Sequence, residues 1–422
     1  MRVAMPVFHP SSPGTILLRP GVELDRELIT RMVELRVRHL WIEYPALELV
    51  SEYVDPRVAA AQGEVTCQIE HAFDAASLGV SAELDFDRYA SAVGGLLQTL
   101  MESNRSQVFL EDLVSSGRPV VRHASSVCYL SVLTGLKLGF YLEEQRSRIP
   151  PSMARQTESL GVGAMLHDVG MPRLDPELTR AWRETGDDDD PRWRAHGMLG
   201  FSMGRGHVEP SAAAVVLHHH QRVDGTGYPA REKLDGSFEP LSGGQIHVFA
   251  RIVHAVDLFD RLTNPFKRGR RPMTRVAALR AMLQDPHRGG IDPVVFGALL
   301  EVCPPYTPGS MVRLNDGRRA VVCGWSAKDP CRPLVCPMAE EIADWASSKP
   351  AKVIDLREQE GLWVREADGQ DVSNDNFTAA DVRRYDLRAI RRGLVNRAGE
   401  LLRQEALRNG VRVPERPDRA AS

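Results

Sequence analysis

The stretch from Ala59 to Val302, more than half of the chain, has a helical sequence pattern and constrains the fold more than any other feature. Glycine and proline are confined there to breaks such as Gly117-Arg118-Pro119 and the segment from Asp224 to Pro229. This pattern predicts a central all-helical domain over residues 59–302, introduced by linker helices. The chain is therefore expected to be mainly α.

Short strand-like runs lie on both sides of the helical stretch. Residues 1–58 alternate such runs with one amphipathic segment from about Asp25 to Leu35, which predicts a small α+β module. On the other side, the turn Asn315-Asp316-Gly317 separates two strand-like runs and is a strong hairpin signal. Residues 303–380 are therefore expected to form a small β module.

The last segment, residues 381–422, is basic. From Arg383 onward it contains 11 arginines and five acidic residues, and apolar residues recur at helical spacing from Leu387 to Leu402. This pattern predicts a terminal amphipathic helix. Such a helix can lie on a membrane or bind a partner, but it more often packs on its own protein with a solvated outer face.

Composition narrows the functional classes. With 53 basic and 56 acidic residues the net charge is -3, so the chain lacks a broad positive surface for a nucleic acid polymer. Its apolar runs are far shorter than the ~20 residues of a membrane span, and its N-terminus lacks the apolar core of a signal peptide. We therefore expect a soluble, cytoplasmic protein of two or three domains.

Histidine is concentrated in the helical stretch, where nine of the 13 histidines lie between His123 and His254. His167 and Asp168 close one predicted helix, ahead of a glycine and proline stop signal. His218-His219-His220 close another. Each of these residues, taken alone, is more often a satisfied core residue or a helix cap than a metal ligand.

Further candidates are a lone histidine, His196, and Asp257, whose surrounding segment is apolar nearly all round. A carboxylate is costly to bury there without a cation or hydrogen bonds. Imidazoles and carboxylates without thiolates form the ligand set of hydrolytic Fe, Mn or Zn centres, and five or more such groups suffice for two ions. The residues alone therefore predict a metal-dependent hydrolase.

An ordered set of motifs then resembles the HD-GYP phosphodiesterases, a branch of the HD-domain metal-dependent phosphohydrolases. The motifs are, in chain order, His123-Ala124-Ser125-Ser126-Val127, His167-Asp168-Val169-Gly170, His196, His219-His220-Gln221, Asp224-Gly225-Thr226-Gly227-Tyr228-Pro229 and Val256-Asp257-Leu258-Phe259-Asp260. The resemblance covers roughly residues 95–285. A lone His-Asp pair is a weak signal, whereas this ordered set with its Gly-Tyr-Pro loop is specific.

The resemblance implies an HD-type helical domain with two divalent metal ions, Fe, Mn or Zn. One ion would be held by His123, His167, Asp168 and Asp257, and the other by His196, His219 and His220, with Asp168 bridging as a catalytic residue. It also implies hydrolysis of cyclic di-GMP to the linear dinucleotide or GMP, in bacterial second-messenger signalling. The partners that it suggests are diguanylate cyclases of the GGDEF type and a second copy of the chain.

Three positions depart from the family pattern. The lysine that usually follows His-Asp-x-Gly, and contacts a phosphate, is Met171 here, and the glutamate that usually follows the paired histidines is Gln221. Pro119 replaces a glutamate that binds a third metal in some members, so two ions are expected. Arg173 is predicted to act as a catalytic residue in place of the missing lysine, because its long fork can reach the same oxygen.

A basic run over residues 266–271 follows the Asp257 segment, where the family has a phosphate-binding loop. Lys267 and Arg268 are predicted to bind the substrate, although an ordinary solvated charge run has the same pattern. Two rival functions stay open: a catalytically weak, metal-bearing receptor or scaffold for cyclic di-GMP, and an enzyme for another nucleotide. The loss of lysine at position 171 favours the receptor, and the complete ligand set favours the enzyme.

Overall fold

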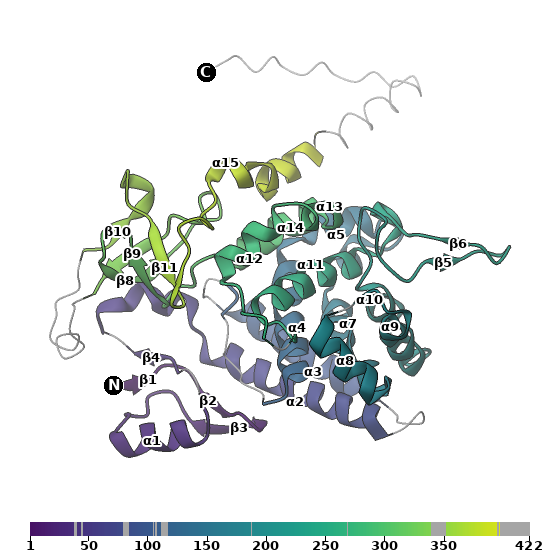
Figure 1. The fold of residues 1–422 in the computed structure, drawn as a ribbon, viewed down its shortest axis with the longest axis horizontal. Helices are drawn as coiled ribbons and strands as arrows, with labels where there is room; N and C mark the ends of the chain where they lie inside the picture. Colours follow the sequence, from purple (N-terminus) through teal and green to yellow (C-terminus); the bar gives the residue numbers. More distant parts are fainter. Residues whose placement is uncertain are drawn as a thin grey trace, which may run out of the picture.

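The computed structural model describes residues 1–422 except 38–39, 44, 79–83, 104, 106–107, 111–116, 187, 268, 339–351, 395 and 397–422. Helices dominate the fold, and Figure 1 shows them gathered in one body, with a small sheet to one side and the N-terminal strands below it. The prediction of a mainly α chain with small flanking modules is confirmed.

The central domain runs from α2 to α14. Its helices are α2 (Pro56–Leu78), α3 (Phe86–Glu102), α4 (Pro119–Lys137), α5 (Gly139–Gln145), α6 (Pro151–Ala154), α7 (Glu158–Leu166), α8 (Pro176–Thr185), α9 (Pro191–Gly204), α10 (Pro210–His218), α11 (Val248–Thr263), α12 (Arg275–Met282), α13 (His287–Gly290) and α14 (Pro293–Val302), with the 3-10 turns η2 (Met171–Arg173) and η3 (Gly243–Gln245). α8, α9 and α14 each begin with Asp-Pro, where the aspartate caps free N–H groups and proline occupies the first turn. Sequence therefore sets where these helices start.

The core of this domain lies between α4 and α7 and their neighbours. Val127, Leu133 and Leu160 are fully buried there. Burying an aliphatic side chain of this size stabilises the fold by roughly 1.5–3 kcal/mol. Among the described residues no single helix is both long and apolar enough to span a membrane; α4 and α5 meet the two conditions only together, as a pair bent by 85°.

One segment of this domain is not helical, which corrects the prediction. Between α10 and α11, β5 (Arg231–Glu232) pairs antiparallel with β6 (Phe238–Glu239), and Figure 1 shows this hairpin projecting away from the helices. Asp235 accepts hydrogen bonds from the Ser237 N–H and hydroxyl, and Gly236 has φ +78°. The prediction failed because strands of two residues leave no alternating pattern to recognise.

The N-terminal module combines two strand pairs with one helix. β1 (Arg2–Val3) pairs with β4 (Ile42–Glu43), and β2 (Val7–His9) pairs with β3 (Ser12–Leu18). The helix α1 (Arg26–Glu34) lies between β3 and β4 in the chain, and the 3-10 helix η1 (Pro45–Tyr53) follows β4. Asp25 caps α1 through the Leu28 N–H. Met5 and Phe8 pack into the core of the helical domain, so the module is docked on that domain.

The C-terminal module is one antiparallel sheet with the strand order β10-β9-β8-β7-β11-β12. Its strands are β7 (Met311–Leu314), β8 (Arg319–Gly324), β9 (Leu334–Pro337), β10 (Ile354–Asp355), β11 (Val364–Ala367) and β12 (Gln370–Asp371). The 3-10 turn η5 (Leu356–Glu358), α15 (Ala379–Val382), η6 (Arg383–Tyr385) and a helix over residues 387–394 follow. Tyr385 packs on Phe296 of α14, and the rest of the predicted terminal helix lies outside the described residues.

Candidate metal centre

Five helices of the central domain bring a histidine or an aspartate to one place. His123 lies near the start of α4, His196 lies on α9, and Asp257 lies on α11. His167 and His219 are the C-terminal caps of α7 and α10. All five side chains are almost fully buried. The two histidine caps stand where their helices end, and each ring contacts a carbonyl oxygen in the last turn of its own helix.

Close packing between α9 and the segment that follows α7 positions the next residue, Asp168. α7 ends at Leu166, so Asp168 lies beyond the helix rather than in its last turn as predicted. Gly170 approaches α9 so closely that a Cβ at this position would overlap the carbonyl oxygen of His196. Any larger residue would push the two segments apart, so the contact between Asp168 and His196 depends on this glycine.

Hydrogen bonds at Nδ1 fix the orientation of four imidazoles. Nδ1 of His167, His196 and His219 lies near the carbonyl oxygens of Ala164 (2.7 Å), Trp193 (2.7 Å) and Val216 (3.0 Å), respectively. Nδ1 of His123 lies 2.6 Å from Oδ2 of Asp260. Because these oxygens accept, each Nδ1 carries the proton, and Nε2 of His167, His196 and His219 keeps its lone pair for another partner, whereas Nε2 of His123 lies 3.1 Å from Oδ1 of Asp257.

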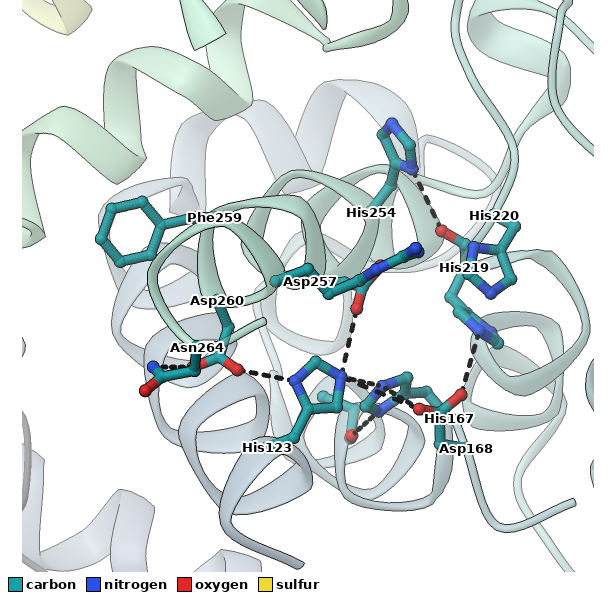
Figure 2. A network of polar contacts seen from close by, with 12 residues as sticks. His123, His167, Asp168, His219, His220, His254, Asp257, Phe259, Asp260 and Asn264 are labelled. Atoms are coloured by element: carbon teal, nitrogen blue, oxygen red, sulfur yellow. Dashed lines mark hydrogen bonds and ion pairs between the residues drawn. The ribbon is translucent and has the colours of Figure 1, made fainter. Parts of the chain in front are cut away.

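These Nε2 atoms converge on the carboxylate of Asp168 (Figure 2). Oδ2 of Asp168 lies 3.8 Å from Nε2 of His123 and 3.5 Å from Nε2 of His167. Oδ1 lies 3.5 Å from Nε2 of His196 and 3.6 Å from Nε2 of His219. The two oxygens of one carboxylate therefore face two different pairs of imidazoles, which is the geometry that a bridging ligand needs.

The donor atoms form two groups. One group contains Asp168, His196, His219 and His220, and the other contains His123, His167 and Asp257; within each group the donor atoms lie within 4.8 Å of one another. The structure thus brings together the residues that the resemblance implied for each ion, except that it groups Asp168 with His196, His219 and His220 rather than with His123.

The spacing inside each group fits a metal ion. Nε2 of His123 lies 3.2 Å from Nε2 of His167, and Nε2 of His196 lies 3.4 Å from Nε2 of His219. Two lone pairs at this distance repel each other unless a cation or a proton lies between them. Ligand atoms ~2.0–2.1 Å from one ion stand about 3.0–3.4 Å apart, so the nitrogens have the spacing of first-row metal ligands.

Burial keeps most of these rings in the neutral form that binds metals. It lowers the pKa of His219 to about 3, and it lowers the pKa of His167 and His220 as well. His123 is different: burial alone would lower its pKa, but hydrogen bonds to Asp257 and Asp260 raise it to about 10. These two carboxylates supply negative charge that a bound cation can use.

The Gly-Tyr-Pro loop packs against the second group. The ring of Tyr228 stacks on His220 with a centroid distance of 4.7 Å. Gly227 lies so close to the backbone of Gln221 and Arg222 that a Cβ would overlap it. The loop can therefore reach His220 only with glycine at this position.

Side-chain hydrogen bonds hold the rest of this loop. The Asp224 carboxylate accepts bonds from the N–H of Thr226 (3.0 Å) and from Nη2 of Arg222 (2.9 Å). Although burial acts in the opposite direction, these partners lower the pKa of Asp224 to about 2. Nε2 of Gln221 donates to the carbonyl oxygen of Pro229. Asp224 and Gln221 thus shape the loop from within.

A cavity of about 400 Å³ opens beside the centre and is lined by His220, Tyr228 and Asp257. Its cationic side chains are Arg194, Arg222, Arg261, Lys267 and Arg270. Lys267, predicted to bind the substrate, lines the cavity and donates to the carbonyl oxygen of Thr185 at 2.8 Å. Arg268 lies outside the described residues. Arg173, on η2, is not among the described residues that line this cavity.

Met171 belongs to an apolar wall next to the centre. It is buried in a cluster with Leu174, Trp182 and Trp193, whose indole rings stack at 3.9 Å. Phe266 packs on this cluster and on the ring of His123, at a centroid distance of 5.0 Å. The position that usually carries the family's lysine is therefore part of a hydrophobic surface.

Three residues around the centre were missed by sequence reasoning: Asp260, Arg261 and Asp188. Asp260 and Arg261 follow Asp257 by three and four positions on α11, which places all three on one helix face. That spacing was the available signal. Asp188 stands in a run of four aspartates, which has the composition of a solvated loop.

Comparisons with known proteins agree with this centre. The HD domain family model matches residues 147–295. A Pseudomonas aeruginosa protein named cyclic di-GMP phosphodiesterase is 26% identical over 307 residues, covering 67% of each chain. A protein of the same name from Vibrio cholerae is 28% identical over 153 residues, covering 34% of this chain and 29% of its own. The response regulator RpfG of Xanthomonas campestris, also named a cyclic di-GMP phosphodiesterase, is 31% identical over 111 residues, covering 25% of this chain and 27% of its own.

A helical core around buried histidine and aspartate clusters defines an HD-domain protein, a class whose members depend on metal ions. Within that class the chain belongs to the HD-GYP family, as its motifs predicted. The chain spans about two thirds of the Pseudomonas protein and under a third of the other two.

Proposed function

We propose that the chain is a metal-dependent phosphodiesterase that hydrolyses cyclic di-GMP to the linear dinucleotide or GMP. The observation that carries this proposal is the Asp168 carboxylate, whose two oxygens face separate groups of buried imidazoles. Relatives named cyclic di-GMP phosphodiesterases support the choice of substrate.

In this proposal the two groups of donors would hold two divalent ions, Fe, Mn or Zn, and Asp168 would be the ligand that the two groups share. The residues for one ion are His123, His167 and Asp257, and those for the other are His196, His219 and His220. Such ions supply a hydroxide at neutral pH and polarise the phosphate for in-line attack.

The protein orients the metal ligands and lines one side of the centre with apolar side chains. Asp260 accepts a hydrogen bond from the Nδ1–H group of His123 and so makes this imidazole a better ligand. The apolar cluster with Met171 and Phe266 excludes water from one side of the centre. On the open side, Lys267 is proposed to meet the substrate. Arg268, which lies outside the described residues, is proposed as a second substrate-binding residue from its sequence position alone, and Arg173 stays a prediction.

Chromatography of the products formed from cyclic di-GMP by metal-loaded protein tests the proposal. We expect cleavage by wild type and none by His167→Ala, whereas His207→Ala, at an exposed histidine outside the centre, keeps the activity. Tight binding of cyclic di-GMP without turnover under Fe, Mn and Zn would favour a receptor. Faster cleavage of another cyclic dinucleotide would change the substrate and keep the chemistry.

A further inference from the structure

Arg261 is a mostly buried cation beside the metal centre. It lies on α11 one turn beyond Asp257, its side chain is 28% exposed, and its Nη1 lies 3.8 Å from Oδ2 of Asp257. It lines the same cavity as Tyr228 and His220. A substrate phosphate held at the centre would therefore lie within reach of this guanidinium.

The present partner of Arg261 is a carboxylate from the loop between α8 and α9. Asp188 pairs with Nη2 of Arg261 and also accepts the indole N–H of Trp182 at 2.8 Å. The next residue, Asp189, pairs with Arg194, whose guanidinium lies 4.6 Å above the ring of Tyr228. This loop thus places two carboxylates on two arginines of the cavity.

A phosphodiester can replace Asp188 on Arg261 with no change in net charge. Each phosphodiester group carries one negative charge and two free oxygens, and the planar fork of arginine pairs with phosphate as it does with carboxylate. The exchange is easy because Asp188 is 40% exposed and can turn into water. An ion pair whose carboxylate still faces water holds its partners less tightly than a fully buried pair.

We propose that Arg261 binds a phosphate of the substrate in place of the lysine absent at position 171, and that Asp188 is an internal anion which this phosphate displaces. The identity of the substrate rests on the proposed function. The phosphate-binding role of Arg261 rests on its contacts with Asp188 and Asp257 in the cavity.

A purely structural role for Arg261 predicts a different outcome. If Arg261 served only to orient Asp257, its removal would lower the metal content. A cation 3.8 Å from a ligand carboxylate instead repels a bound metal ion, so its removal leaves the metal content unchanged or raises it. Metal content therefore separates positioning of a ligand from binding of a phosphate.

The experiment combines calorimetric titration of inorganic phosphate into metal-loaded protein with initial rates on cyclic di-GMP and elemental analysis. Loss of one charge-assisted pair should make Arg261→Gln weaker by roughly 10- to 100-fold in phosphate affinity and in kcat/KM. Arg261→Lys should recover part of this loss, since it keeps the charge without the fork. Asp188→Asn should bind phosphate about two- to fivefold more tightly, because the competing anion is gone. Arg231→Gln, whose arginine pairs with Glu239 on the exposed β5–β6 hairpin, is the matched control and should behave as wild type.

Unchanged phosphate affinity in Arg261→Gln would overturn the proposal, and so would loss of metal from this variant. A larger loss in Arg173→Gln than in Arg261→Gln would overturn it in favour of the arginine predicted from the sequence. If phosphate binding depends on Arg261 but wild type leaves cyclic di-GMP intact, only the proposed function fails. If wild type cleaves cyclic di-GMP and Arg261→Gln does so equally well, only this inference fails.

Discussion

Two buried polar clusters meet the same helix, α11, and they are built differently. At Arg251 the cluster is closed in the sense that its charges are paired, although Nε of Arg251 has no hydrogen-bond partner among the described residues. Nη1 donates to Asp292 at 2.6 Å, Nη2 donates to Gln145 at 2.6 Å, and the hydroxyl of Tyr141 donates to Asp292 at 2.8 Å. At Asp168 the cluster is open, because imidazole lone pairs face one another. A closed cluster balances its own charge, whereas an open one needs a cation. The two clusters are therefore told apart by how their polar atoms are paired and not by the types of residue that they contain.

Removing the shared carboxylate should break the open cluster with the largest effect. We expect Asp168→Ala to lose most of both metal ions and to reduce turnover by more than about 10³-fold, because the loss exceeds that of one electrostatic contact. The unfolding free energy of the metal-free protein should change less than in Asp292→Ala, because the charged His123 lies 3.8 Å from this carboxylate and makes its shorter contacts with Asp257 and Asp260. Elemental analysis, product chromatography and urea unfolding after chelation measure these effects. A variant that keeps two ions would contradict the bridging role.

Breaking the closed cluster should lower the stability of the fold and leave metal binding unchanged. Asp292→Ala leaves the charge of Arg251 buried without its main partner, and we expect a loss of about 3–5 kcal/mol in unfolding free energy. Metal content per folded molecule should stay at the wild-type level. Asp292→Asn combined with Arg251→Met removes both charges while keeping an Asx cap on α14, so it should be more stable than Asp292→Ala. Loss of metal from folded Asp292→Ala would show that the clusters are coupled.

A change at Asp260 sharpens the comparison inside the centre. Asp260→Asn weakens the hydrogen bond that orients His123, so we expect the ion on the His123 side to bind roughly 10- to 100-fold more weakly. The other ion should keep its affinity, because His196 and His219 are oriented by backbone carbonyls. Competition with a chelator measures the two affinities. Asn264→Ala, which removes a 3.2 Å contact to Asp260 and a 3.3 Å contact to Thr263, is the milder control. An equal loss of affinity for both ions would show that the two groups of ligands are not oriented independently.

The sequence was informative where function depends on local order. Motif spacing singled out the histidines and aspartates that the fold gathers, and glycine, proline and aspartate signals marked helix ends around them. It was silent on pairs that only the fold creates, such as Arg261 with Asp188, which stand 73 positions apart. The β5–β6 hairpin was missed for a different reason, since its strands are too short to show a period.

The smallest effect is expected from restoring the family's lysine. Met171 is 7% exposed and packs with Trp182 and Trp193, so the ammonium group of Met171→Lys would emerge from an apolar wall. Burying part of this charge should lower stability by about 1–3 kcal/mol, as for other poorly compensated polar groups. If Arg261 already supplies the charge at the phosphate, kcat/KM should change only a few-fold relative to wild type and to Met171→Leu, the uncharged control. A rise in turnover of about tenfold or more would mean that the centre lacks a cation which position 171 can provide. Arg261 would then have only a structural role, and its ion pair with Asp188 would be a closed cluster like the one at Arg251.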